Sequence, residues 1–141
     1  MNHELHHVRY LIIHCSATRC DRSYSLAALR RQHVDINRWD DIGYHYYITR
    51  DGTVHTSRPS TQVGAHCHGH NHESLGICYE GGLLPDGRPA DTRTEAQKES
   101  LQQLLLHLKA LYPGASIKGH YEMGAKKACP CFCASAAYKN L

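Results

Sequence analysis

The sequence has no long hydrophobic segment. None of its apolar runs approaches the roughly 18 residues that a transmembrane helix requires. The first apolar run, residues 8–13, is interrupted by Arg9 and is too short for the core of a signal peptide. We therefore expect a protein that does not insert into membranes and is made in the cytoplasm without a signal peptide.

The sequence also lacks the features of a disulfide-rich protein, of a nucleic-acid-binding protein and of a chain with several domains. The seven cysteines show no regular disulfide-framework spacing, and because their number is odd we expect mostly reduced thiols. The formal net charge of +3 is too small to indicate nucleic-acid binding and only mildly favours an anionic polymer. No internal repeat or linker divides the 141 residues. We expect a monomer with one domain over residues 1–141, of which residues 1–7 form a polar tail.

The pattern of apolar residues and turn formers predicts an α/β protein. The most secure element is a helix in which Thr94 and Gln97 form a capping box and leucines follow at helical spacing. An Asp-Gly pair at residues 51–52 predicts a hairpin. The expected architecture is a mixed sheet of about five strands with helices on both faces. The predicted strands are residues 8–13, 43–48, 54–57, 75–79 and 115–118, and the predicted helices are residues 25–38, 94–111 and a short one after residue 132.

Three residues far apart in the sequence suggest a metal site. His14 and His120 end predicted strands, and Cys129 lies in a loop just beyond the last strand. Two imidazoles and a thiolate make a three-ligand zinc site that leaves a fourth tetrahedral position open, as in catalytic zinc. The spacing alone does not decide between this site and ordinary loop histidines with a small buried thiol.

Two denser clusters compete with this set. Residues 66–72 alternate His with other residues in a glycine-rich loop, a pattern that also fits a polar, solvated rim. Cys129, Cys131 and Cys133 are separated by single residues, which is tighter than the usual spacing of zinc-binding cysteines. Neither cluster has a second half at matching spacing, so a closed structural zinc site is not favoured.

Taken in order, several short motifs resemble the type-2 zinc family of N-acetylmuramoyl-L-alanine amidases, which includes short phage lysozymes and peptidoglycan recognition proteins. The resemblance covers residues 8–132. Each motif alone is weak, but their order and intervals are specific. They are His14-Cys15-Ser16-Ala17-Thr18, Gly43-Tyr44-His45-Tyr46, Arg50-Asp51-Gly52-Thr53, Gly64-Ala65-His66, Asn71-His72, Ser74-Leu75-Gly76-Ile77, Gly81-Gly82, Gly119-His120-Tyr121-Glu122 and Lys127-Ala128-Cys129-Pro130.

The resemblance implies a role for each matching residue. It makes one Zn²⁺ the cofactor, with His14, His120 and Cys129 as its ligands. Tyr44 matches the active-site tyrosine of the family, and Lys127 matches its basic residue two positions before the cysteine ligand. Two further residues fall where the family lines its substrate groove; they are His66 and Asn71.

The sequence departs from the family pattern near its end. The loop before Cys129 is one residue longer than expected, so Lys126 is an alternative to Lys127 as the catalytic lysine. Cys133 stands where relatives commonly have an Asp that caps the last helix, and Cys is a poor cap. Cys131 is a rival zinc ligand, although on an extended segment its side chain points away from that of Cys129.

The activity implied by the resemblance is zinc-dependent hydrolysis of the amide between N-acetylmuramic acid and L-alanine, with peptidoglycan or muropeptides as the partner. One setting is a phage or prophage endolysin that reaches the cell wall after release. Another is a cytosolic amidase that recycles anhydro-muropeptides. The third alternative is a recognition module that binds muropeptides without cutting them, but such proteins typically lack the cysteine ligand.

Overall fold

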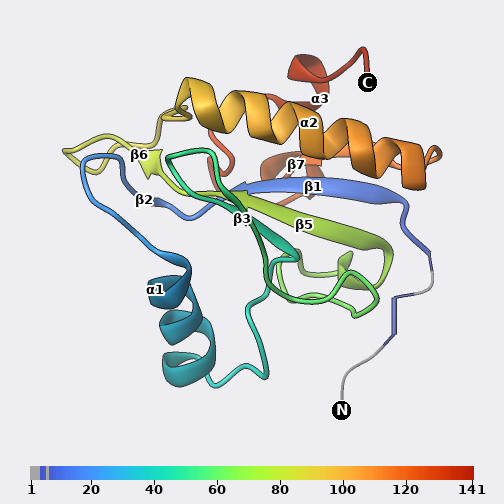
Figure 1. The fold of residues 1–141 in the computed structure, drawn as a ribbon, viewed down its shortest axis with the longest axis horizontal. Helices are drawn as coiled ribbons and strands as arrows, with labels where there is room; N and C mark the ends of the chain where they lie inside the picture. Colours follow the sequence, from blue (N-terminus) through green and yellow to red (C-terminus); the bar gives the residue numbers. More distant parts are fainter. Residues whose placement is uncertain (1–3, 6) are drawn as a thin grey trace.

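The structure, a computed structural model, describes residues 4–5 and 7–141. It contains a five-stranded sheet in the order β4-β3-β5-β1-β7, with α1 on one face and α2 on the other (Figure 1). Only β4 runs antiparallel to its neighbour. The predicted mixed sheet with helices on both faces is therefore confirmed. The strands of this sheet are β1 (Tyr10–Cys15), β3 (Tyr46–Ile48), β4 (Val54–Thr56), β5 (Ser74–Tyr79) and β7 (Ser116–Gly119).

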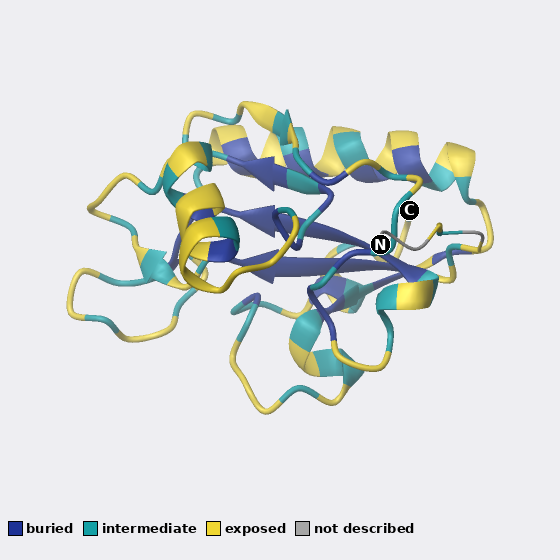
Figure 2. Cartoon of the chain, turned by 90° about the horizontal axis from the view of Figure 1, so that it is seen from below, coloured by how far each residue is buried: buried dark blue, intermediate teal, exposed yellow. Residues whose placement is uncertain are grey.

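Each face of the sheet packs against its own helix layer. Leu11 and Ile13 of β1 join the core cluster that includes the buried leucines of α2 (Glu95–Leu111). On the other face, Cys78 and Tyr47 join a smaller cluster with Leu29 of α1 (Leu26–Arg30). Figure 2 shows that the strands of the central sheet are buried, while the helices have exposed residues on their outer faces. His14 is in register with Cys78, so it lies on the α1 face.

Helix α2 forms as its sequence predicts. The side chain of Thr94 accepts a hydrogen bond from the Gln97 backbone, and the side chain of Gln97 accepts one from the Thr94 backbone. The Gln97 amide also donates to the carbonyl groups of Ile48 and Glu80, which ties the start of the helix to β3 and to the residue after β5. The capping box thus fixes the start of the helix, and the Gln97 amide fixes the position of that end on the sheet.

Replacing one core leucine of α2 is expected to destabilise the domain strongly. Leu105 is fully buried, so Leu105→Ala should leave a cavity and lower the free energy of unfolding by about 2–5 kcal/mol. The neighbouring Leu106 is 48% exposed, and Leu106→Ala should change it by less than about 1 kcal/mol. Urea unfolding followed by circular dichroism measures both values, and equal losses in the two variants would contradict this packing.

Several elements differ from their predicted form. The helix expected over residues 25–38 begins as α1 and continues as a π-helix, Arg31–Ile36. A two-stranded parallel sheet of β2 (Thr18–Arg19) and β6 (Gly82–Leu83) was not predicted, because each strand has only two residues. The remaining elements are η2 (Asn71–Glu73), η3 (His120–Met123) and α3 (Ala134–Ala137).

The two chain ends show how local sequence and tertiary contacts combine. Residues 1–3 and 6 of the predicted polar tail lie outside the described residues, while Leu5 donates a backbone hydrogen bond to Thr61 and packs against the core. At the other end, Cys133 makes no side-chain cap for α3, and the Glu122 carboxylate accepts from the Ser135 backbone instead. Among residues 4–5 and 7–141, no helix combines the length and apolar character needed to cross a membrane.

Candidate metal centre

The register of the sheet brings two of the predicted ligands together. In β1, Ile13 pairs with Gly119 at the end of β7, so His14, the next residue of β1, lies beside His120, the first residue after β7. Their ring centres are 4.4 Å apart. His14 is only 1% exposed, whereas His120 is partly exposed, so solvent reaches the pair at His120.

Hydrogen bonds hold the loop of the third predicted ligand against the ends of these strands. The Cys129 carbonyl accepts from the Tyr121 backbone at 2.9 Å, and the next carbonyl, of Pro130, accepts from the Tyr79 hydroxyl at 2.6 Å. The backbone N–H of Cys15 donates to Cys129 Sγ at 3.1 Å. This bond holds the sulfur at the end of β1, next to His14.

The donor atoms of His14, His120 and Cys129 form one compact group. All lie within 4.8 Å of one another. Tetrahedral zinc, with Zn–N bonds of about 2.0–2.1 Å and Zn–S bonds of about 2.3 Å, places its ligand atoms roughly 3.3–3.6 Å apart, so small side-chain shifts would suffice. Two imidazoles and a thiolate are donors that zinc prefers. The three residues therefore fit a zinc ion with one remaining coordination position.

Burial keeps the imidazoles in the state that binds metal. It lowers the pKa of His14 and of His120, and the positive charge of Lys127 lowers both further. Neutral imidazole has a free lone pair, whereas imidazolium has none. Lys127 is thus one of the charges that act on both imidazoles. The choice between Lys126 and Lys127 as the catalytic lysine stays a prediction.

Tyr44 lies beside the same cluster. Its ring centre is 5.0 Å from that of His14. Burial raises the pKa of its phenol well above the usual value, and the neighbouring thiols of Cys78, Cys129 and Cys15 raise it further. The phenol is thus neutral near pH 7, so it can donate a hydrogen bond but is a poor general base.

The two residues predicted to contact substrate lie in the loop that borders the cluster. His66 is 9% exposed, and its Nδ1 lies 2.9 Å from Nε2 of His14. Asn71 Oδ1 accepts hydrogen bonds from the backbone N–H groups of His66 and Cys67. The solvated rim expected for this loop is found at His68 and His72, which are exposed, but not at His66. Contact of His66 and Asn71 with substrate stays a prediction.

The rival thiols lie outside the cluster. Cys131 Sγ donates to the Gly82 carbonyl at 3.3 Å, and Cys133 is exposed. Cys131 is not part of the group of three donors, but the reason given for its direction, an extended segment, was wrong. Its φ of 73° belongs to the left-handed region, so the segment is not extended there.

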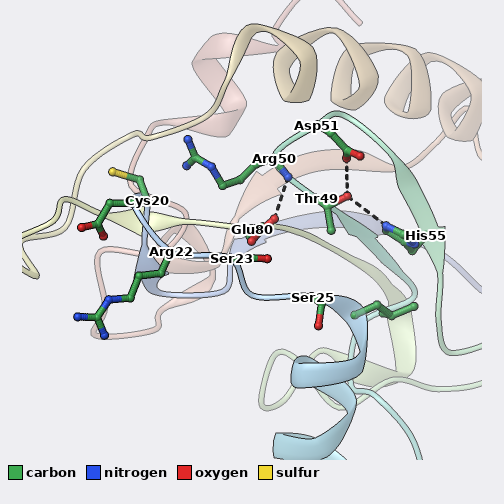
Figure 3. Close-up of a pocket in the computed structure, with 11 residues that line it drawn as sticks. Cys20, Arg22, Ser23, Ser25, Thr49, Arg50, Asp51, His55 and Glu80 are labelled. Carbon is green, nitrogen blue, oxygen red and sulfur yellow. Dashed lines mark hydrogen bonds between the residues drawn. The ribbon is translucent and has the colours of Figure 1, made fainter.

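A separate cavity of about 490 Å³ lies between the loop after β2 and the β3–β4 hairpin (Figure 3). None of the five predicted catalytic and metal-binding residues lines it. Two hydrogen bonds join groups in its lining, since the Glu80 carboxylate accepts from the Arg50 backbone and the Thr49 hydroxyl donates to Asp51. We therefore place the chemistry at the histidine–cysteine cluster and not in this cavity.

The fold and the cluster define a class: α/β proteins with a central, mostly parallel sheet and an open His–His–Cys donor set beside the ends of parallel strands. Comparison with known proteins specifies the family. A family model described as N-acetylmuramoyl-L-alanine amidase matches residues 4–132. The chain therefore belongs to the N-acetylmuramoyl-L-alanine amidase family, hydrolases that act on peptidoglycan. The resemblance read from the sequence motifs is confirmed.

Individual relatives agree with this assignment. The endolysin of Escherichia phage T7 is 42% identical over 122 residues, which are 86% of this chain and 80% of the endolysin. The endolysin of Enterobacteria phage T3 is 40% identical with the same coverage. Among solved structures, the Clostridium intestinale endolysin LysCS is 26% identical with a TM-score of 0.79, over 94% of this chain and 80% of that one. Bumblebee PGRP-SA shares the fold, with 24% identity and a TM-score of 0.79 over 99% and 86% of the two chains.

Proposed function

We propose that this amidase depends on one Zn²⁺ ion held by His14, His120 and Cys129, and that it cuts the amide between N-acetylmuramic acid and L-alanine. The observation that carries the proposal is the convergence of these three donors within 4.8 Å, on a side of the sheet that is partly open to solvent. We further propose that residues 1–141 act as a single domain.

When bound, zinc would supply Lewis acidity toward the amide carbonyl and lower the pKa of water from 15.7 to about 7. The chain's own residues would do the rest. The Lys127 ammonium would stabilise the negative charge that develops on the carbonyl oxygen as the tetrahedral intermediate forms. Tyr44, whose phenol stays protonated, would donate a hydrogen bond that orients the attacking water or the substrate.

The biological setting that we propose is an endolysin. The phage T7 and T3 relatives carry that name and match over most of both chains. A cytosolic recycling amidase would use the same residues, so substrate form distinguishes the two. A non-catalytic recognition module is less favoured, since the chain has Cys129 together with Tyr44 beside the cluster.

The purified protein is expected to release new L-alanine amino termini from intact sacculi, and to act on them at least as well as on soluble anhydro-muropeptides. Removal of zinc by a chelator should abolish the release, and added Zn²⁺ should restore it. Amino-terminal labelling of the digests and metal analysis measure these outcomes. Full activity of zinc-free protein would overturn the proposed cofactor, and activity on anhydro-muropeptides alone would overturn the endolysin role.

A further inference from the structure

The ring of His66 occupies a slot with glycine walls. A Cβ atom added to Gly76 would lie 2.6 Å from the His66 ring, and one added to Gly64 would lie 2.8 Å from it. Real Cβ atoms do not approach other atoms so closely, so both positions require glycine for this ring to fit. The ring is therefore fixed in orientation from two sides.

Hydrogen bonds hold the backbone around this slot. Asn71 Oδ1 accepts from the N–H groups of His66 and Cys67, each at 2.9 Å. His45 fixes the Gly76 wall twice, because its backbone N–H donates to the Gly76 carbonyl at 2.9 Å and its Nδ1 accepts from the Gly76 N–H at 3.0 Å. These bonds hold the backbone on both sides of the His66 ring in place.

The hydrogen bonds of His66 determine where its proton lies. The Ser74 hydroxyl donates to the His70 carbonyl at 2.8 Å, so its oxygen is left to accept from His66 Nε2 at 3.3 Å. His66 then carries its proton on Nε2 and has a lone pair on Nδ1. That lone pair faces Nε2 of His14 at 2.9 Å, and the two atoms can bond only if His14 Nε2 carries a proton.

We propose that His66 is a positioning residue that fixes the tautomer and the ring orientation of the metal ligand His14. With its proton on Nε2, His14 keeps a free lone pair on Nδ1, the nitrogen left to bind a metal together with His120 and Cys129. Metal-ligating histidines usually donate their second N–H to an oxygen acceptor, and here a neutral imidazole replaces that oxygen. The inference rests on the proposed function, in which His14 is a zinc ligand.

The protonation pattern can be measured on the metal-free protein. Long-range ¹H–¹⁵N correlation spectra of ¹⁵N-labelled protein assign the protonated nitrogen of each histidine. We expect both His14 and His66 to carry their proton on Nε2. In His66→Ala, His14 should become a mixture of the two tautomers. A His14 protonated on Nδ1 in the unmodified protein would overturn the proposal, independently of any metal or activity.

Zinc affinity provides the second test, by competition with a chromogenic chelator. His66→Ala should weaken zinc binding about 10–100-fold. His66→Asn, whose Oδ1 can accept from His14 near the position of the lost Nδ1, should recover most of that affinity. His68→Ala removes an exposed histidine from the same loop and should leave the affinity unchanged. Thermal melting of each zinc-free variant identifies a loss that comes from unfolding.

The outcomes separate this inference from the proposed function. If the unmodified protein does not bind zinc, the proposed function fails, while the tautomer measurement still tests the link between the two histidines. If His66→Ala is folded and binds zinc as tightly as the unmodified protein but has a raised KM, His66 acts only on substrate and the positioning role is overturned. Equal losses in His66→Ala and His66→Asn, with both variants folded, would also contradict it.

Discussion

Cys129→Ala is expected to abolish zinc binding and hydrolysis together. The thiolate is the only sulfur in the group of three donors, and its removal leaves two imidazoles for a metal that needs three protein ligands in such a site. Loss of a residue that only supports a ligand typically costs 10–100-fold in affinity, so loss of the ligand itself should cost more than about 100-fold. Amide hydrolysis should fall to background with it.

Metal content after dialysis and release of L-alanine amino termini measure the two effects in parallel. Cys133→Ala is the matched control, because Cys133 is exposed and makes no side-chain cap for α3. It should retain both zinc and activity. Hydrolysis at an undiminished rate by zinc-depleted Cys129→Ala would exclude this cluster as the reaction centre.

Lys127→Ala is expected to lower kcat about 10²–10³-fold while zinc stays bound. Loss of one preformed group that stabilises the oxyanion typically has an effect of this size. The charge of Lys127 acts on both His14 and His120, as expected for a lysine with this role. Since Lys127 is not a ligand, its loss should leave metal affinity nearly unchanged or slightly increased.

The neighbouring lysine offers a sharp comparison. Lys126→Ala removes the same charge one residue earlier in the same loop, and it should leave kcat within a few-fold of the unmodified protein. Steady-state kinetics on a defined muropeptide, with metal content measured for each preparation, distinguish the two. A large loss in Lys126→Ala with normal turnover in Lys127→Ala would assign the catalytic lysine to position 126.

Much of the fold could be predicted because local sequence and tertiary structure agree there. The capping box at Thr94 and the leucine stripe after it define α2 without outside help. The Asp-Gly pair gives the β3–β4 hairpin for the same reason. The predictions were poorer where tertiary contacts replace local signals. Glu122 supplies the acceptor that Cys133 lacks at the start of α3, and no pattern within that helix reveals it.

By itself the sequence determined the class of fold, the family, and the identity of the candidate donors, since motif order and residue type are properties of the chain alone. Only the tertiary structure decided which atoms meet. The parallel register of β1 and β7 brings His14 beside His120, and the Cys15 N–H donates a hydrogen bond to the sulfur of Cys129. The tertiary structure also showed that His66, a loop histidine in the sequence, is buried and lies within hydrogen-bond distance of His14. The physical reason is that directional contacts such as hydrogen bonds depend on the position and orientation of groups, and those are fixed only when the sheet and its loops have packed.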